Sequence, residues 1–180
     1  MNIVWALADD VFVNNTVDLK QLKAIGSMWG SWRTRKGYAT DNVVCHDRRQ
    51  ARKLLDTKFN SQCNFYIPNA DVETLGRPTG VRLYEGSFLD IDIKNEDELV
   101  VVNLVATVAD VVLLLGFEFE PSNADVKTRN YNGLFTHAIR SHPDVQWVLV
   151  DTQSELPEEM VNLDNLTKDT LANVIKLLNA

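Results

Sequence analysis

The side chains best suited to chemistry in this 180-residue chain are carboxylates that follow short apolar runs. Asp9 and Asp10 follow NIVWALA, Glu118 and Glu120 lie at the end of VVLLLGFEF, and Asp151 follows QWVLV. Carboxylates that converge in one crevice could hold a hydrated cation such as Mg²⁺, or could raise one another's pKa. The alternative is that these acids cap the helices that follow them.

A second group of candidates follows the run NVVC, where His46 and Asp47 precede Arg48 and Arg49. A histidine at the end of a strand can exchange a proton near neutral pH, and arginines can bind a phosphate. The alternative is that residues 48–58 form the solvated face of one helix. The candidate catalytic residues are therefore His46, Asp47 and Glu118, and the candidate ligand-binding residues are Asp9, Asp10, Arg48, Arg49 and Asp151.

Several common site motifs are missing from the sequence. No glycine-rich dinucleotide fingerprint follows the first apolar run, and there is no phosphate-binding loop with its lysine and no nucleophile elbow. The three histidines do not have metal-ligand spacing, so we predict no metal centre built on histidine and cysteine.

Charge is unevenly distributed along the chain. The formal net charge is −7, yet residues 33–58 contain eight Lys and Arg against three Asp. Within SMWGSWRTRKGY, Trp32 and Arg33 combine an aromatic ring with a cation, a pairing suited to a small anionic ligand. The overall negative charge argues against binding to extended nucleic acid.

Short apolar runs alternate with helical patterns, which indicates an α/β fold with a largely parallel sheet. We predict one three-layer domain over residues 1–180, with a mainly parallel, Rossmann-like sheet of five to seven strands. Strands are predicted at 2–8, 42–46, 63–67, 81–84, 88–93, 111–119 and 146–150. Helices are predicted from a cap at Asn15 or Thr16 to an end at Gly30 or Arg35, with Met28 and Trp29 on the apolar face, and at 47–59, 96–109, 131–141 and 167–178.

We expect a cytoplasmic protein without a membrane span. The N-terminus has no basic region before its apolar run, and polar residues interrupt the apolar stretch from Leu99 to Phe119. Cys45 and Cys63 are too few for a disulfide scaffold, and we interpret both as buried free thiols.

The segment TDNVVCHD, a following helix and then CNFYIP resemble uncharacterised conserved α/β proteins of tailed bacteriophages. The resemblance covers about the first third of the chain and implies no activity. From the residues, we expect a site for a phosphate-bearing small molecule, a nucleotide or sugar nucleotide, at the carboxyl edge of the sheet. The alternative is a non-enzymatic, phage-type accessory protein that acts as a homo-oligomer, such as a homodimer.

Overall fold

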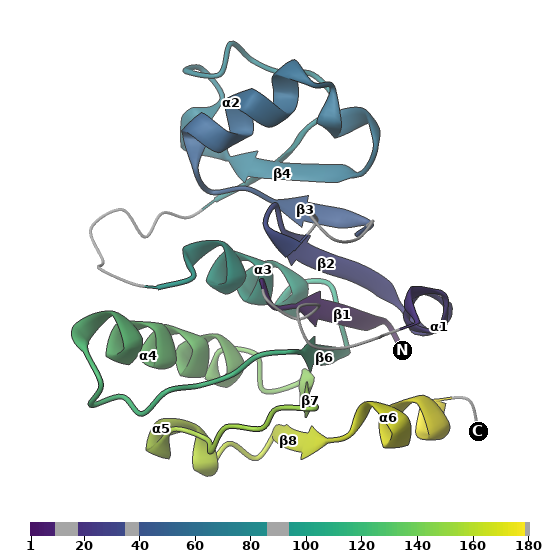
Figure 1. Cartoon of the computed structure of the whole chain (residues 1–180), viewed down its shortest axis with the longest axis vertical. Coiled ribbons are helices and arrows are strands. Elements are labelled where there is room, and N and C mark those ends of the chain that lie inside the picture. The colour runs from purple at the N-terminus through teal and green to yellow at the C-terminus, as the bar shows by residue number, and fades with distance from the viewer. Residues whose placement is uncertain (10–17, 35–39, 86–93, 179–180) are drawn as a thin grey trace.

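The computed structural model describes residues 1–9, 18–34, 40–85 and 94–178, and places all of its strands in one parallel sheet (Figure 1). Eight strands lie in the order β5-β4-β3-β2-β1-β6-β7-β8. The predicted α/β fold with a Rossmann-like parallel sheet is confirmed, with one strand more than the predicted maximum. The strands are β1 (Ile3–Leu7), β2 (Ser27–Ser31), β3 (Asn42–Val44), β4 (Asn64–Pro68), β5 (Arg82–Tyr84), β6 (Val111–Leu115), β7 (Gln146–Val150) and β8 (Leu166–Asp169).

Helices form the layers on either side of this sheet. In the described ranges they are α1 (Leu19–Ile25), α2 (Arg48–Asp56), α3 (Glu96–Ala106), α4 (Val126–Arg140), α5 (Glu158–Val161) and α6 (Leu171–Leu178). Helix α3 packs against α4 and lies over β1, β2 and β3, whereas α1 packs against α6. The position of α3 determines which side chains reach the carboxyl ends of the first three strands.

The main core is built on β1 and β6, two adjacent strands near the middle of the sheet. Trp5 and Leu114 are fully buried there, and the Trp5 indole N–H donates a hydrogen bond to the Leu22 carbonyl at 3.0 Å. A second core lies under α2, where Phe59 meets Phe65 edge to face. Each such apolar side chain removed from water contributes about 1.5–3 kcal/mol. The burial of β1 on both faces explains its uninterrupted apolar sequence.

The first predicted helix is wrong at both ends. The structure starts it at Leu19, where Asp18 accepts a hydrogen bond from the Lys20 N–H, and ends it at Ile25. Met28 and Trp29, which were expected on the helix, lie in β2. The cause is the close approach of Gly26 to β1, because a Cβ atom at Gly26 would fall on the Ile3 carbonyl.

The strand predicted at 111–119 is confirmed only over Val111–Leu115, because Gly116 takes a positive φ of 80° and turns the chain out of the sheet. The segment predicted as one helix at 167–178 contains β8 and then α6. The helix predicted at 131–141 begins earlier, at Val126, where Asp125 caps it. The strand predicted at 88–93 lies outside the described residues, while β5 pairs in parallel with β4.

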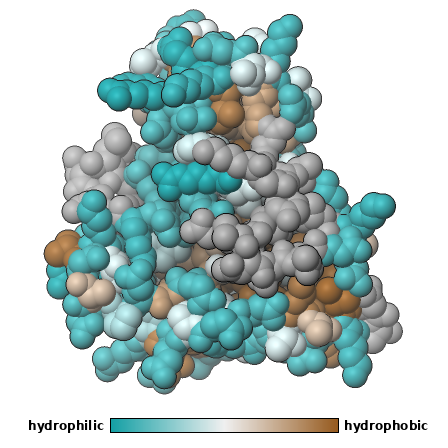
Figure 2. Space-filling view, in the orientation of Figure 1, coloured by the Kyte–Doolittle hydropathy of each residue, from teal (hydrophilic) through white to brown (hydrophobic). Residues whose placement is uncertain are grey.

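The surface in Figure 2 is mainly hydrophilic, with apolar side chains in a few separate places. No helix among the described residues is long and apolar enough to cross a membrane. Neither cysteine forms a disulfide. Cys45 is buried as predicted, whereas the predicted burial of Cys63 is wrong, because that residue is partly exposed.

The contact at Gly26 predicts that Gly26→Ala will destabilise the protein by more than about 1 kcal/mol, since β1 or α1 must move to admit a methyl group. Gly133→Ala is the matched control, because Gly133 is exposed in α4 and a Cβ there meets nothing within 4 Å. That change should stabilise by about 0.5–1 kcal/mol through helix propensity. Urea unfolding measures both, and equal effects would contradict the steric explanation.

Candidate functional site

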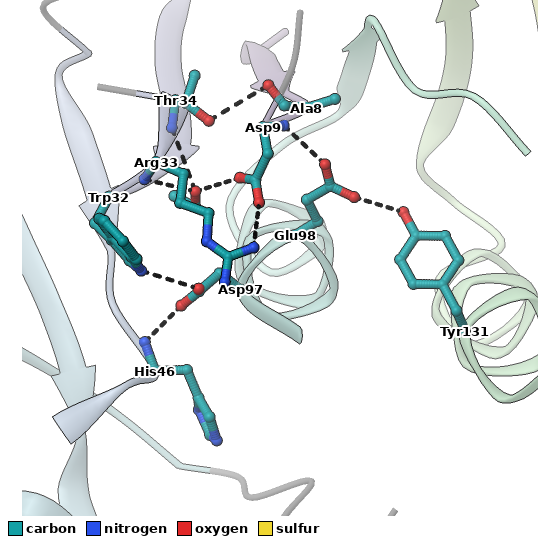
Figure 3. A network of polar contacts seen from close by, with 10 residues as sticks. Ala8, Asp9, Trp32, Arg33, Thr34, His46, Asp97, Glu98 and Tyr131 are labelled. Atoms are coloured by element: carbon teal, nitrogen blue, oxygen red, sulfur yellow. Dashed lines mark hydrogen bonds and ion pairs between the residues drawn. The ribbon is translucent and has the colours of Figure 1, made fainter. Parts of the chain in front are cut away.

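The order of the strands reverses at β1, which has β2 on one side and β6 on the other. In open parallel sheets, ligands bind at the carboxyl ends of the strands near such a point. Here the N-terminal turn of α3 meets the ends of β1, β2 and β3 (Figure 3). We call this group of residues the β1–β3 edge site; its members are Asp9, Ser31, Trp32, Arg33, His46, Asp97 and Glu98.

Glu98 connects the end of β1 to α4. Its Oε1 accepts a hydrogen bond from the Asp9 backbone N–H at 2.7 Å, and its Oε2 accepts one from the Tyr131 hydroxyl at 3.0 Å. Only 4% of Glu98 is exposed. Burial, helped by the negative charge of Asp9, raises the pKa of Glu98 to about 7 despite these hydrogen bonds. Glu98 therefore changes charge near neutral pH.

Asp97 likewise accepts hydrogen bonds from residues that follow β2 and β3. Its Oδ1 accepts from the His46 backbone N–H at 2.6 Å, and its Oδ2 accepts from the Trp32 indole N–H at 3.1 Å. Burial raises the pKa of Asp97 to about 6, although the bond from His46 opposes the shift. Two adjacent carboxyl groups with raised pKa values, at the carboxyl edge of a sheet, form a candidate functional site on physical grounds.

Asp9 and Arg33 form the outer part of the edge site. The Ser31 hydroxyl donates to Asp9 Oδ1, and Arg33 Nη1 lies 3.6 Å from Asp9 Oδ2. The Arg33 guanidinium carbon lies 5.4 Å from the centre of the Trp32 ring. Because the Arg33 side chain is 52% exposed, much of this cation faces solvent, beside carboxylates that are almost fully buried.

His46 lies in a short chain of polar side chains. Its Nδ1 is 2.7 Å from the Tyr84 hydroxyl, and its Nε2 is 3.0 Å from Glu96 Oε1. The tautomer of the ring decides which nitrogen donates. Both ring nitrogens are therefore occupied, and His46 would need to exchange one partner before acting on a ligand as a general base.

The other predicted site residues lie at the carboxyl ends of several different strands and do not all meet at the β1–β3 edge site. Asp47 caps α2 by accepting from the Gln50 N–H at 2.9 Å. Arg48 lies 4.0 Å from Asp71, and both Arg48 and Arg49 are exposed. Asp10 lies outside the described residues.

Glu118 and Asp151 lie at the other end of the carboxyl edge, after β6 and β7. Glu118 lies beyond the end of β6 and accepts from the backbone N–H groups of Gln153 and Ser154, at 2.9 and 2.7 Å. Asp151 accepts from the Leu171 N–H at 3.0 Å and so fixes the start of α6. The α3 carboxylates thus bring Asp9 and His46 together, while Glu118 and Asp151 hold the segment after β7.

Sequence reasoning missed the roles of Asp97 and Glu98. They were not among the candidate site residues, and negative charges in a first turn also suit the N-terminus of any helix. The available signal was the apolar sequence LVVV directly after them, since a helix buried on most sides also buries its first turn.

The edge site does not favour Mg²⁺. Both oxygens of Asp97 and both oxygens of Glu98 already accept hydrogen bonds from protein donors, so a cation would have to compete with them. Across the described ranges, no group of three or more His, Cys, Asp or Glu is arranged to hold a metal ion.

Glu98 predicts a pH dependence of stability. Its pKa rises from 4.5 to about 7 on folding, so its protonated form favours the folded state and the protein loses stability as pH rises through that interval. Glu98→Gln mimics the protonated acid and should be more stable than wild type at pH 8, by about 1–3 kcal/mol. Urea unfolding at pH 5.5 and pH 8 tests this, with the exposed Glu155→Gln as control. An equal pH dependence in Glu98→Gln and wild type would contradict it.

For Glu118 we predict the opposite pH dependence of the free energy of unfolding. Partial burial raises its pKa, but the hydrogen bonds from Gln153 and Ser154 outweigh that effect and leave the pKa below its ordinary value. Its contribution to stability is therefore present at neutral pH and is lost as the solution becomes acidic. Glu118→Gln should lower the free energy of unfolding at pH 7 by about 1 kcal/mol.

The control for Glu118→Gln is Glu120→Gln, because Glu120 is exposed and pairs with Lys94 at 3.3 Å. Chemical denaturation at pH 7 and at pH 4 measures both variants. If Glu118→Gln instead keeps its stability and loses ligand binding, then Glu118 faces a ligand.

No family model, curated protein or solved structure matches this chain. The chemistry of its own residues is therefore the basis on which its function is inferred.

Proposed function

We propose that this protein binds a phosphate-bearing small molecule, a nucleotide or a sugar nucleotide, at the β1–β3 edge site. The observation that carries the proposal is Arg33, a half-exposed guanidinium held by Asp9 at the edge of a parallel sheet where the strand order reverses. Guanidinium groups bind phosphate through two parallel hydrogen bonds. Binding, rather than a particular reaction, is what we propose.

The edge site divides into an outer cationic part and an inner acidic part. Arg33 faces solvent, while Asp97 and Glu98 are buried beneath it. A phosphate would be repelled by the inner carboxylates, so it belongs on the outer side at Arg33. Asp9 contributes by holding Arg33 in place, since the Asp9 side chain itself is only 8% exposed.

Trp32 adds a surface for a base. Its indole nitrogen is fixed by Asp97, which holds the orientation of the ring, and its side chain remains partly exposed. Stacking on an aromatic ring is worth about 1–3 kcal/mol per base and does not depend strongly on which base it is. A nucleotide therefore uses two groups, with its phosphate on Arg33 and its base on Trp32.

The test is binding of AMP, ADP and UDP-glucose, each with and without Mg²⁺, measured by calorimetry and by thermal shift. A ligand at 100 times its Kd should stabilise the protein by about 2.7 kcal/mol. Arg33→Ala should weaken binding at least tenfold, and Arg33→Lys should restore only part of it, because lysine lacks the planar fork. Arg82→Ala, an exposed arginine in β5, is the matched control and should bind normally.

The proposal is wrong if none of these compounds binds, or if Arg33→Ala and Arg82→Ala have the same affinity as wild type. The alternative, a non-enzymatic accessory protein that acts as a homo-oligomer, would then be favoured by a dimeric mass in light scattering. One observation points that way: Leu83, in the edge strand β5, is 49% exposed.

A further inference from the structure

The two buried acids of α3 are each connected to one of the groups that would bind the ligand (Figure 3). Glu98 Oε1 accepts a hydrogen bond from the Asp9 backbone N–H, and the Asp9 carboxylate lies 3.6 Å from Arg33 Nη1. Asp97 Oδ2 accepts from the indole N–H of Trp32. A negative charge on either acid therefore lies close to the proposed positions of the phosphate and the base.

The charge around the two acids is mainly negative within the described part of the chain. Around Glu98 the titratable and charged groups are Asp9, Tyr131 of α4 and Lys94, whose Nζ lies 5.5 Å from the centre of the Tyr131 ring. Around Asp97 they are Asp9, Arg33, His46, Cys45 and Tyr84. Lys94 already pairs with Glu120 at 3.3 Å. When all are ionised, Asp9 and the two α3 acids carry three negative charges, against one positive charge on Arg33.

A bound phosphate would add negative charge to this poorly solvated region. A like charge nearby disfavours the ionised form of a carboxyl group, and the effect is strong where water is excluded. Burial has already raised the pKa of Glu98 to about 7, so a small further effect is enough to keep it protonated at neutral pH. Coupling of this kind is reciprocal, because a protonated Glu98 in turn favours the bound phosphate.

The hydrogen-bond partners show which of the two acids is better able to take up the proton. Glu98 Oε2 bonds to the Tyr131 hydroxyl, which can accept a hydrogen bond as well as donate one. A protonated Glu98 can therefore donate to Tyr131 and still accept from the Asp9 N–H. The partners of Asp97 are the backbone N–H of His46 and the indole N–H of Trp32, and both are donors only.

We infer that binding of an anionic ligand at Arg33 is coupled to the uptake of one proton by Glu98, so that the edge site binds its ligand more tightly as the solution becomes acidic. The inference rests on the proposed function, since it assigns a form of regulation to that same site. Ionised Glu98 opposes the phosphate, and the neutral acid does not. The proton comes from solvent and returns to it when the ligand leaves.

The experiment is calorimetric measurement of the Kd of UDP-glucose at pH 5.5 and at pH 8. The diphosphate of this ligand is esterified at both ends and keeps its charge over that range, whereas the phosphate of AMP gains charge near pH 6. The Kd should be about three- to tenfold lower at pH 5.5, where Glu98 is mostly neutral. At pH 7, two buffers of different ionisation enthalpy should reveal uptake of about half a proton per ligand bound, because Glu98 is then about half protonated in the free protein. This second measurement needs no variant.

Glu98→Gln provides the test at the level of the residue. Its side chain is neutral at every pH, so at pH 8 it should bind UDP-glucose about three- to tenfold more tightly than wild type, and its Kd should depend little on pH. Glu155→Gln is the matched control, because Glu155 is exposed and should leave the pH dependence unchanged. His46→Gln should also retain the pH dependence, although imidazole groups commonly titrate in this range.

Equal Kd values for wild type at the two pH values would overturn the inference. A pH dependence that survives in Glu98→Gln, or that disappears in His46→Gln, would also overturn it, because another group would then take up the proton. These results leave the proposed function intact, since UDP-glucose still binds. If none of the tested nucleotides binds at either pH, the proposed function itself is wrong and the coupling fails with it.

Discussion

Two backbone N–H groups at the ends of β1 and β3, those of Asp9 and His46, need acceptors where the strands leave the sheet. Buried N–H groups without partners are costly, and α3 supplies the partners in the form of Glu98 and Asp97. The hydrogen bonds fix α3 over the first three strands and also fix Trp32 and Tyr131, which donate to the same two carboxylates. The consequence is that two acids are held in a poorly solvated place, with pKa values of about 6 and 7. The raised pKa values at this edge of the sheet therefore follow from the need to provide acceptors for two backbone N–H groups.

The carboxyl edge then divides into two halves of different charge. Around β1–β3 the acids are buried and a cation, Arg33, faces outward. Around β6 and β7, Glu155, Glu158 and Glu159 line an open cavity, while Arg140 and Lys168 bond to the backbone carbonyls of Glu159 and Ser154. Glu118 belongs to neither surface, because its carboxylate is occupied by Gln153 and Ser154.

The sequence was sufficient for the fold class because buried parallel strands carry continuous apolar runs, and NIVWALA, CNFYI and QWVLV all lie on strands. The prediction of secondary structure failed where a tertiary contact overrides a local sequence pattern. Met28 and Trp29 continue the helical spacing of the preceding residues, yet the approach of Gly26 to Ile3 sends them into β2. Asp9 was predicted because it directly follows an apolar strand. Asp97 and Glu98 were not predicted, since they come from a helix that docks on a distant part of the chain: Glu98 is 89 positions after Asp9. Burial of an acid depends on such distant contacts and leaves only a weak trace in one sequence.

The place of β1 in the middle of the sheet also constrains how the chain can assemble. One neighbour, β2, follows closely, but the other, β6, comes so late that the bond between Asn2 and Asp110 spans 108 residues. Closing a loop of that length costs conformational entropy before any contact compensates for it, and folds dominated by such contacts form slowly. During synthesis from the N-terminus, the edge of β1 that pairs with β6 therefore stays open until β6 has been made. This unpaired edge is the surface on which misassociation between nascent chains would begin.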